Sequence, residues 1–422
     1  MTKRIFLVNY ALLILLLSLI SISFLKAQSP LPPFARYKVI PNPEKEVVTV
    51  EAQIELQNVT PYIKDFGQLQ SISWLVGGKE IAVKSERLKD IIIFSQVPSS
   101  GKAEIIYTIK FMTQLDNKTR PQDIHLFGGP DFLFVCEGLF LGLNGKEGGL
   151  VEVQWELPEG WKLGLGRTGL QLFHDTQERF WVAGRLKHTE ERKVGNALLQ
   201  IAVLEIPPNQ DINWLVNSIA AVFQYAWQTI GPLEDQDYGI AIFPMGIMPQ
   251  PGWAKWRSCF ASTSPMVPPH EILHFWRSNT PAWFREGVLE YLSKKIMVRC
   301  GLMNEEMLQL WLRTRLIVHA TLVKKQGTIK TLAESSTELE RGTGGEDIYN
   351  LMPVLAYKLD KEIQKHNPKS SLDDVYSAAC RKPLWQQVDV VALTKETTGY
   401  DPKPLFDKYF YAKVEKPEEL LN

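Results

Sequence analysis

The stretch from Pro268 to Ser293 reads PPHEILHFWRSNTPAWFREGVLEYLS, and it decides how the rest of the chain is interpreted. It contains the pattern HExxH, from His270 to His274. Residues four apart share one face of a helix, so the two imidazoles can bind one tetrahedral metal ion while Glu271 lies beside it. This arrangement predicts the site of a zinc hydrolase, with Zn²⁺ as the metal.

The remainder of the stretch predicts a second helix. Pro269 and Pro281 both stand where a first helical turn tolerates proline, and Thr280 has a side chain suited to an N-cap. We therefore expect two helices, Pro269–Ser278 and Pro281–Lys295, joined by a tight turn.

The predicted helix pair supplies a third metal ligand. About four residues follow His274 in the first helix and about five precede Glu286 in the second, at about 1.5 Å of rise each. An antiparallel pair would thus bring Glu286 level with His274, as a ligand. Glu290 lies one turn further on the same face. We expect it to accept the second ring N–H of His270 or His274 as an outer-shell partner.

This pattern resembles the gluzincin metallopeptidases, in which HExxH is followed by a helix of the form W-x-x-E-G-x-x-E-Y, here Trp283–Tyr291. The glycyl aminopeptidase family and peptidase-MA-like proteins are the most similar groups, and we expect this chain to lack the PDZ module of many of them. The resemblance implies zinc ligands at His270, His274 and Glu286, and a catalytic glutamate at Glu271.

Two departures from these families are visible. Only 11 residues separate His274 from Glu286, which is fewer than in most of the group, although the helix-rise argument accommodates the shorter connection. In the aminopeptidases, a glutamate near the edge strand of a small sheet binds the free amine of the substrate. We expect the edge within Met245–Phe260, yet Gly246 to Ser264 contains no acid. Peptidase chemistry is therefore expected, and aminopeptidase specificity is left open.

A tyrosine completes the expected catalytic set. Tyr349 follows a glycine-rich turn and resembles the tyrosine that donates to the oxyanion in gluzincins. Tyr357 is an alternative, and the reading of either as a core residue stays open. His319, within an apolar helical run, is expected to be a helix histidine with a hydrogen-bond partner and not a ligand.

Patterning along the chain predicts an α+β protein with an amino-terminal antiparallel β domain, followed by a gluzincin catalytic domain made of a small sheet, the HExxH helix and a mostly helical subdomain. The expected divisions are 1–28 for a signal peptide or membrane anchor, 29–208 for the β-rich domain and 209–422 for the metallopeptidase domain. The strands expected in the β domain are Glu46–Gln57, Ser71–Val76, Ile91–Phe94, Ala103–Met112, Phe132–Leu143, Leu150–Leu157, Phe180–Val182 and Leu198–Leu204. The later elements are a helix at Ile212–Ile230 capped by Asp211, a strand at Tyr238–Phe243, and helices at Glu305–Lys325 and Asp347–His366, the second kinked at Pro353.

The amino terminus and the composition indicate an exported chain. Lys3 and Arg4 precede an apolar run, Ile5–Leu25, which is typical of an export signal but also long enough for a membrane anchor. Lys+Arg and Asp+Glu both total 47, a balance that gives no support for nucleic-acid binding. The four cysteines permit disulfides in an exported chain, or buried free thiols.

The expected function is an exported, zinc-dependent peptidase acting on a peptide or protein substrate, secreted or associated with a membrane through residues 5–25. Zinc-activated water would be the nucleophile and Glu271 the general base. Two alternatives remain: a catalytically inactive, peptidase-like binding or scaffold protein, and a zinc hydrolase of another kind, such as an epoxide or ester hydrolase. Endopeptidase and aminopeptidase activity are not distinguished at this stage.

Overall fold

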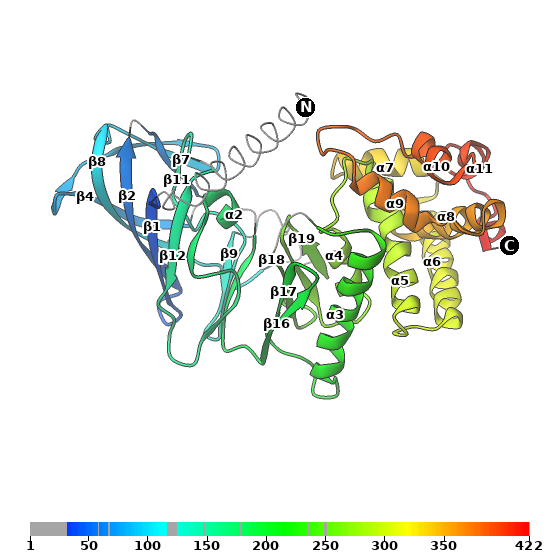
Figure 1. Ribbon diagram of the computed structural model, residues 1–422, viewed down its shortest axis with the longest axis horizontal. Coiled ribbons are helices and arrows are strands. Elements are labelled where there is room, and N and C mark those ends of the chain that lie inside the picture. The colour runs from blue at the N-terminus through cyan, green and yellow to red at the C-terminus, as the bar shows by residue number, and fades with distance from the viewer. Residues whose placement is uncertain are drawn as a thin grey trace, which may run out of the picture.

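The computed structural model describes residues 32–421, except for 58, 66–67, 116–124, 147, 178, 234–236 and 249–250. The expected export segment, 1–28, lies outside these residues. None of the helices formed by the described residues is long and apolar enough to cross a membrane. The described elements run from β-sheets at one end of the molecule, through a small mixed sheet, to a group of helices at the other end (Figure 1).

Three sheets make up the amino-terminal part. A seven-stranded sheet has the order β14-β12-β1-β2-β8-β4-β5, and two four-stranded sheets have the orders β13-β15-β10-β9 and β11-β3-β7-β6. All of the strand pairs are antiparallel except β1 with β12, which is parallel. The bounds are β1 Ala35–Asn42, β2 Val47–Gln57, β3 Pro61–Lys64, β4 Leu69–Val76, β5 Lys79–Ile81, β6 Lys84–Leu88, β7 Ile91–Ser95, β8 Ser100–Lys110, β9 Leu126–Gly128, β10 Phe132–Val135, β11 Gly142–Leu143, β12 Leu150–Trp155, β13 Lys162–Leu165, β14 Gly169–Leu172, α2 Phe173–Gln177 and β15 Trp181–Gly184.

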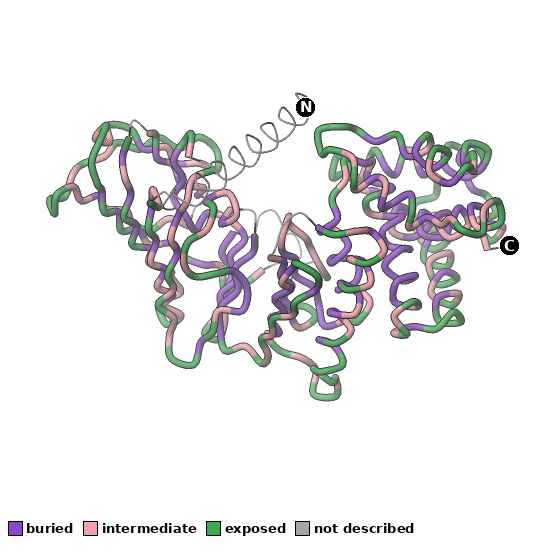
Figure 2. Tube along the Cα trace, viewed as in Figure 1, coloured by how far each residue is buried: buried purple, intermediate pink, exposed green. Residues whose placement is uncertain are grey.

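The long strands follow the alternation expected of a half-buried sheet. In β2, every second side chain from Val48 to Leu56 is buried, while the residues between them face outward. The alternation of buried and exposed residues along these strands can be followed in Figure 2. One expected strand, Phe132–Leu143, is instead two short strands in different sheets, β10 and β11, because Gly138 between them turns with a φ of 77°.

The second part contains a five-stranded sheet and the helices. The sheet has the order β16-β17-β18-β20-β19, with β17, β18 and β20 mutually parallel. The bounds are β16 His188–Val194, β17 Ala197–Val203, α3 Ile212–Thr229, β18 Asp237–Phe243, β19 Gly252–Ala254, β20 Ser258–Ser262, α4 Pro268–Leu273, η2 Trp283–Val288, α5 Leu289–Arg299, α6 Glu305–Gln326, α7 Leu332–Glu340, α8 Glu346–His366, α9 Leu372–Cys380, α10 Val390–Thr398, α11 Lys403–Tyr409 and η3 Pro417–Leu421.

The position of β17 differs from the sequence prediction. Leu198–Leu204 was expected to belong to the amino-terminal β domain, which would end near residue 208. Instead, β17 pairs with β18 in register from Leu198↔Asp237 to Val203↔Ile242, inside the five-stranded sheet. Almost every residue of β17 is buried, because both faces of this sheet are covered. The predicted α+β architecture, an amino-terminal and mainly antiparallel β region followed by a small sheet and helices, is confirmed.

The two faces of the five-stranded sheet bury different cores. Leu199, Ile201 and Ile240 pack with α3 and the helices, whereas Phe243 and Phe260 point to the opposite face. That second face meets the four-stranded sheet β13-β15-β10-β9 through a cluster that also contains Phe134, Leu165, Phe180 and Val182. The ring of Phe134 lies edge-on to Phe243 and Phe260, with centroids 5.5 and 5.6 Å apart. The two parts of the chain therefore share one apolar interface.

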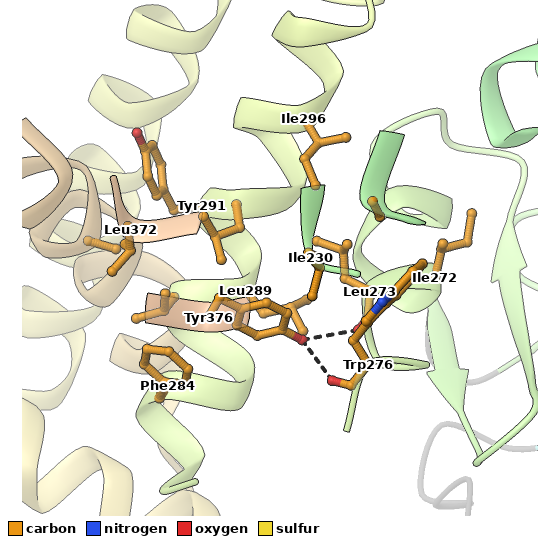
Figure 3. Packing of buried hydrophobic residues seen from close by; sticks show 14 of the residues in the cluster. Ile230, Ile272, Leu273, Trp276, Phe284, Leu289, Tyr291, Ile296, Leu372 and Tyr376 are labelled. Atoms are coloured by element: carbon orange, nitrogen blue, oxygen red, sulfur yellow. Dashed lines mark hydrogen bonds between the residues drawn. The ribbon is translucent and has the colours of Figure 1, made fainter. Parts of the chain in front are cut away.

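The end of α4 is held by a buried tyrosine of α9. The hydroxyl of Tyr376 lies 3.1 Å from both Leu273 O and Trp276 O, as Figure 3 shows. Leu273 O ends α4 and also accepts from Trp276 N at 3.1 Å, whereas Trp276 O lies in the turn that follows and also accepts from Cys380 Sγ at 3.3 Å. Tyr376 therefore ties α9 to the end of the helix that carries the HExxH motif.

Replacing Tyr376 with phenylalanine should destabilise the protein without changing its shape. The change removes a buried hydroxyl donor from two carbonyls that each keep one other partner, at a cost of about 0.5–1.5 kcal/mol. Urea unfolding followed by circular dichroism would measure the loss. Tyr411→Phe, at a tyrosine that is 58% exposed, is the matched control and should cost less than about 0.5 kcal/mol. Equal stability of the two variants would contradict this role for Tyr376.

Candidate metal centre

The helix α4 carries the HExxH residues into the interior. It follows β20 directly, and Pro268 and Pro269 occupy its first two positions, where their missing N–H groups cost nothing. His270 and Glu271 are both buried. The helix is shorter than predicted, ending at Leu273 and not at Ser278, since the following N–H groups bond back three residues and not four. Tyr376 adds a hydrogen bond to Leu273 O at this end. His274 keeps helical backbone angles at the C-cap, so the spacing of the two histidines is preserved.

Glu286 comes from the next element, η2, a single π-helical segment continuous with α5. Thr280 does not cap it as predicted. The N-cap is Ala282, whose N–H donates to Glu340 Oε1 of α7 at 3.1 Å, so a side chain from another helix satisfies this terminus. Gly287 allows α8 to pack closely against η2, because a Cβ at this position would lie only 2.5 Å from Met352 Cγ and 2.6 Å from Ile348 O. Glu286 is thereby placed next to α8.

Three side chains converge at the junction of α4 and η2. His270 Nε2 and His274 Nε2 lie 3.1 Å apart, and Glu286 Oε2 lies 3.5 Å from the first and 3.6 Å from the second. These three are the one such group of donors that could hold a metal among the residues that the structure describes. Ligands about 2.05 Å from a tetrahedral zinc stand about 3.3 Å from one another, so the observed separations fit a shared zinc ion.

Glu290 binds His270 on the side of the ring that faces away from the shared centre. Its Oε2 lies 2.7 Å from His270 Nδ1, the ring nitrogen that faces away from the shared centre. Its other oxygen, Oε1, lies 3.2 Å from both Lys294 Nζ and Arg315 Nη2. A carboxylate in this position orients the imidazole and fixes which nitrogen is free to bind the metal.

Burial and mutual charge shift the acidity of the site. Burial alone would lower the pKa of His270, but the nearby carboxylates of Glu286 and Glu290 outweigh it and raise that pKa to about 10. For His274, burial prevails and lowers the pKa to about 4. Burial opposes ionisation of Glu286, yet the two histidines hold its pKa at about 2. Burial raises the pKa of Glu271 to about 8, so this carboxyl group has the basicity of a proton acceptor near neutral pH.

Of the two tyrosines considered, the structure places Tyr349 in the site. Its hydroxyl donates to Glu286 Oε2 at 3.1 Å from the first turns of α8. Tyr357, two turns further along α8, accepts a hydrogen bond from Gln309 Nε2 at 2.9 Å and packs against Tyr291. His319 is buried, with Nδ1 2.7 Å from Asp347 Oδ1, as expected for a histidine with a structural partner.

The site opens into a cleft of about 980 Å³. One wall is the edge of the five-stranded sheet, β19, which lies in the segment where the edge was predicted and passes directly over Glu271. A Cβ on Gly252 would lie only 2.4 Å from Glu271 Oε1. Several lining residues were not anticipated from the sequence: Lys255, Arg277, Arg285, Lys294 and Arg315. Lys294 follows Glu290 by four residues, a spacing at which opposite charges on a helix pair, so the sequence could have indicated this ion pair. Arg315 comes from α6, and nothing in the sequence around it indicated that it would reach the site.

The fold is similar to those of solved metallopeptidases. An aminopeptidase N family protein from Idiomarina loihiensis aligns with a TM-score of 0.72 and 14% identity, covering 92% of this chain and 78% of that one. A mutant M1 zinc metallopeptidase from Deinococcus radiodurans, bound to a Tyr-Ser-Ala substrate, aligns with a TM-score of 0.58 and 12% identity, covering 91% and 94%. A mutant two-domain M1 zinc metallopeptidase bound to L-arginine gives a TM-score of 0.54 at 13% identity, covering 91% and 94%. No family model and no curated protein matches the sequence. This chain therefore has the fold of the M1 metallopeptidases.

Removing the carboxylate of Glu286, which lies beside both histidines, should abolish metal binding. Glu286→Ala leaves only two imidazoles, too few for a stable zinc site. Metal analysis of the purified protein should find about one zinc per wild-type chain and almost none in the variant. Glu306→Ala, at an exposed glutamate of α6, is the control and should bind zinc as the wild type does. Full zinc content in Glu286→Ala would exclude it as a ligand.

Proposed function

We propose that this chain is an exported, zinc-dependent peptidase that hydrolyses peptide bonds. The observation that carries the proposal is the convergence of His270, His274 and Glu286 at zinc-ligand separations, beside the buried carboxyl group of Glu271. The fold shared with zinc metallopeptidases, one of them bound to a peptide substrate, supports the same assignment. Export rests on the sequence of residues 1–28.

The two imidazole nitrogens and the carboxylate oxygen would hold the zinc, with Glu290 orienting His270. Bound zinc supplies a Lewis acid that lowers the pKa of a coordinated water and polarises the substrate carbonyl. Glu271, one residue after His270, would take a proton from the attacking water and pass it to the leaving amine. The site thus needs both a metal and a base, and the chain brings its side chains for both tasks into one cleft.

Two further features position a peptide. The exposed edge of β19 can pair with an extended chain by main-chain hydrogen bonds, which holds the backbone without reading the side chains. Tyr349, whose hydroxyl now donates to Glu286, would turn its donor to the oxyanion that develops on the scissile carbonyl. Burial, with the nearby Glu286, keeps the pKa of Tyr349 well above its usual value, so the hydroxyl stays protonated as a donor.

Glu271→Gln should separate chemistry from metal binding. The amide cannot accept the proton, so turnover should fall by about 10²- to 10⁴-fold while zinc content stays at the wild-type level. A digest of a peptide library, analysed by mass spectrometry with and without a chelator, provides the measurement. Glu306→Gln is the control on the outer surface of α6. An unchanged rate in Glu271→Gln would refute the base, and a zinc-loaded wild-type protein that cleaves no peptide would refute the proposed activity.

Gly252→Ala should damage catalysis without unfolding the chain. The new methyl group would displace the Glu271 side chain, whose Oε1, Cγ and Cδ would lie 2.4, 2.6 and 2.7 Å from the added Cβ. A displacement of about 1 Å can reduce the rate about a hundredfold. We expect kcat to fall by this order, with an unchanged melting temperature and zinc content. Gly148→Ala, at a glycine with nothing within 4 Å of the added Cβ, should change neither.

A further inference from the structure

Lys255, at the end of the edge strand, has its ammonium group fully engaged inside the protein. Its Nζ donates to Cys136 O at 2.7 Å, Glu137 Oε1 at 3.2 Å and Gln177 O at 3.4 Å. The side chain is only 9% exposed. An ammonium group has three donors, and all three are used here. Lys255 therefore has no free donor to offer to a substrate, although it lines the cleft beside β19.

Glu137, the carboxylate next to Lys255, is equally occupied. Its Oε1 binds Lys255, and its Oε2 accepts from Lys64 Nζ at 2.8 Å. Burial opposes ionisation of Glu137, but the two lysines outweigh it and lower its pKa. A peptide's free amino terminus would have to displace a protein ammonium group to bind there. The negative charge of Glu137 is thus already balanced by Lys255 and Lys64.

The cleft itself carries a surplus of positive charge. Five basic residues line it, against three acidic ones, Glu271, Glu286 and Glu290. Lys294 and Arg315 both bind Glu290, and Lys255 binds Glu137. Across the described part of the chain, no carboxylate forms an ion pair with Arg277 or Arg285. Among the described residues, Arg277 and Arg285 are therefore the basic residues of the cleft that have no carboxylate partner.

Arg277 and Arg285 are placed to act on a substrate. They lie in and just after the connection between α4 and η2, three residues after His274 and one before Glu286. The guanidinium of Arg277 lies 5.1 Å from the ring centroid of Trp256, a cation–π contact that uses none of its N–H donors, and no described residue accepts a hydrogen bond from them. Arg285 Nη1 donates to Thr280 O, and both arginines are exposed. A guanidinium fork matches a carboxylate in geometry as well as charge.

We propose that Arg277 and Arg285 select the peptide by a carboxylate group, and that a free amino terminus is not required. The carboxylate is either an aspartate or glutamate side chain or the carboxyl terminus of the peptide. This inference rests on the proposed function and adds the substrate class to it.

Peptide binding to the zinc-loaded Glu271→Gln protein tests the inference without turnover. Fluorescence anisotropy would compare labelled peptides that differ in one group: Glu against Gln within the sequence, a free against an amidated carboxyl terminus, and a free against an acetylated amino terminus. We expect loss of one of the two carboxylates to weaken binding about tenfold, the value of one charge-assisted contact. The pair that responds identifies the source of the carboxylate. Acetylation should change binding less than twofold.

Variants in the same background locate the effect. Arg277→Gln and Arg285→Gln should each reduce the preference for the carboxylate peptide, and together they should abolish it. Arg313→Gln, at an exposed arginine of α6 outside the cleft, should keep the preference intact. Melting temperatures would establish that the variants fold, and Arg277→Lys should retain part of the preference through its charge.

The outcomes separate this inference from the proposed function. Binding that ignores both carboxylates, that survives the double arginine substitution, or that requires a free amino terminus would overturn the inference, even if the wild-type protein cleaves peptides. Carboxylate-dependent binding by a wild-type protein that binds zinc and cleaves nothing would instead overturn the peptidase and leave the recognition in place.

Discussion

The structure depends on how closely η2 approaches α4 and α8. Gly287 has no side chain to separate η2 from α8, and its backbone fits against Ile348 and Met352. This contact sets the depth of Glu286, so that its Oε2 stands about as far from each histidine nitrogen as two zinc ligands stand from each other. The same closeness of buried groups shifts their pKa values apart, with that of His270 high and that of Glu286 low. The site is held ready by packing, and its electrostatics follow from that packing.

The surrounding core explains why such a site can be rigid. The five-stranded sheet is covered on one face by α3 and the helices and on the other by the aromatic cluster around Phe134, so β20 and the helix after it have little freedom. Tyr376 binds the far end of α4 (Figure 3). Glu340 accepts from the N–H at the start of the segment that holds Glu286. Side chains of α9 and α7, both distant in sequence, thus hold the two short helical segments α4 and η2 in place. A catalytic constellation needs this support, because small displacements are costly.

The basic residues that line the cleft fall into two groups, those that bind carboxylates of the protein and those that we propose bind the substrate. Lys255, Lys294 and Arg315 each bind a carboxylate inside the protein, two of them on Glu290, the carboxylate behind His270. Arg277 and Arg285 line the cleft, and no described carboxylate forms an ion pair with either of them. The balanced composition of the whole chain, 47 basic and 47 acidic residues, conceals this local surplus, because net charge says nothing about which charges are paired.

The sequence by itself determined the elements whose signals are local. The HExxH spacing, the alternation in β2, the capped helix after Asp211 and the carboxylates at Glu286 and Glu290 could all be recognised within a few residues. Only the tertiary structure decided the rest: that β17 joins the second sheet, that α4 ends at Leu273, that Tyr349 and not Tyr357 reaches the cleft, and that Lys255 meets Glu137. Each of these features depends on contacts between segments far apart in the chain. The pattern of apolar residues along one segment does not show which other segment packs against it.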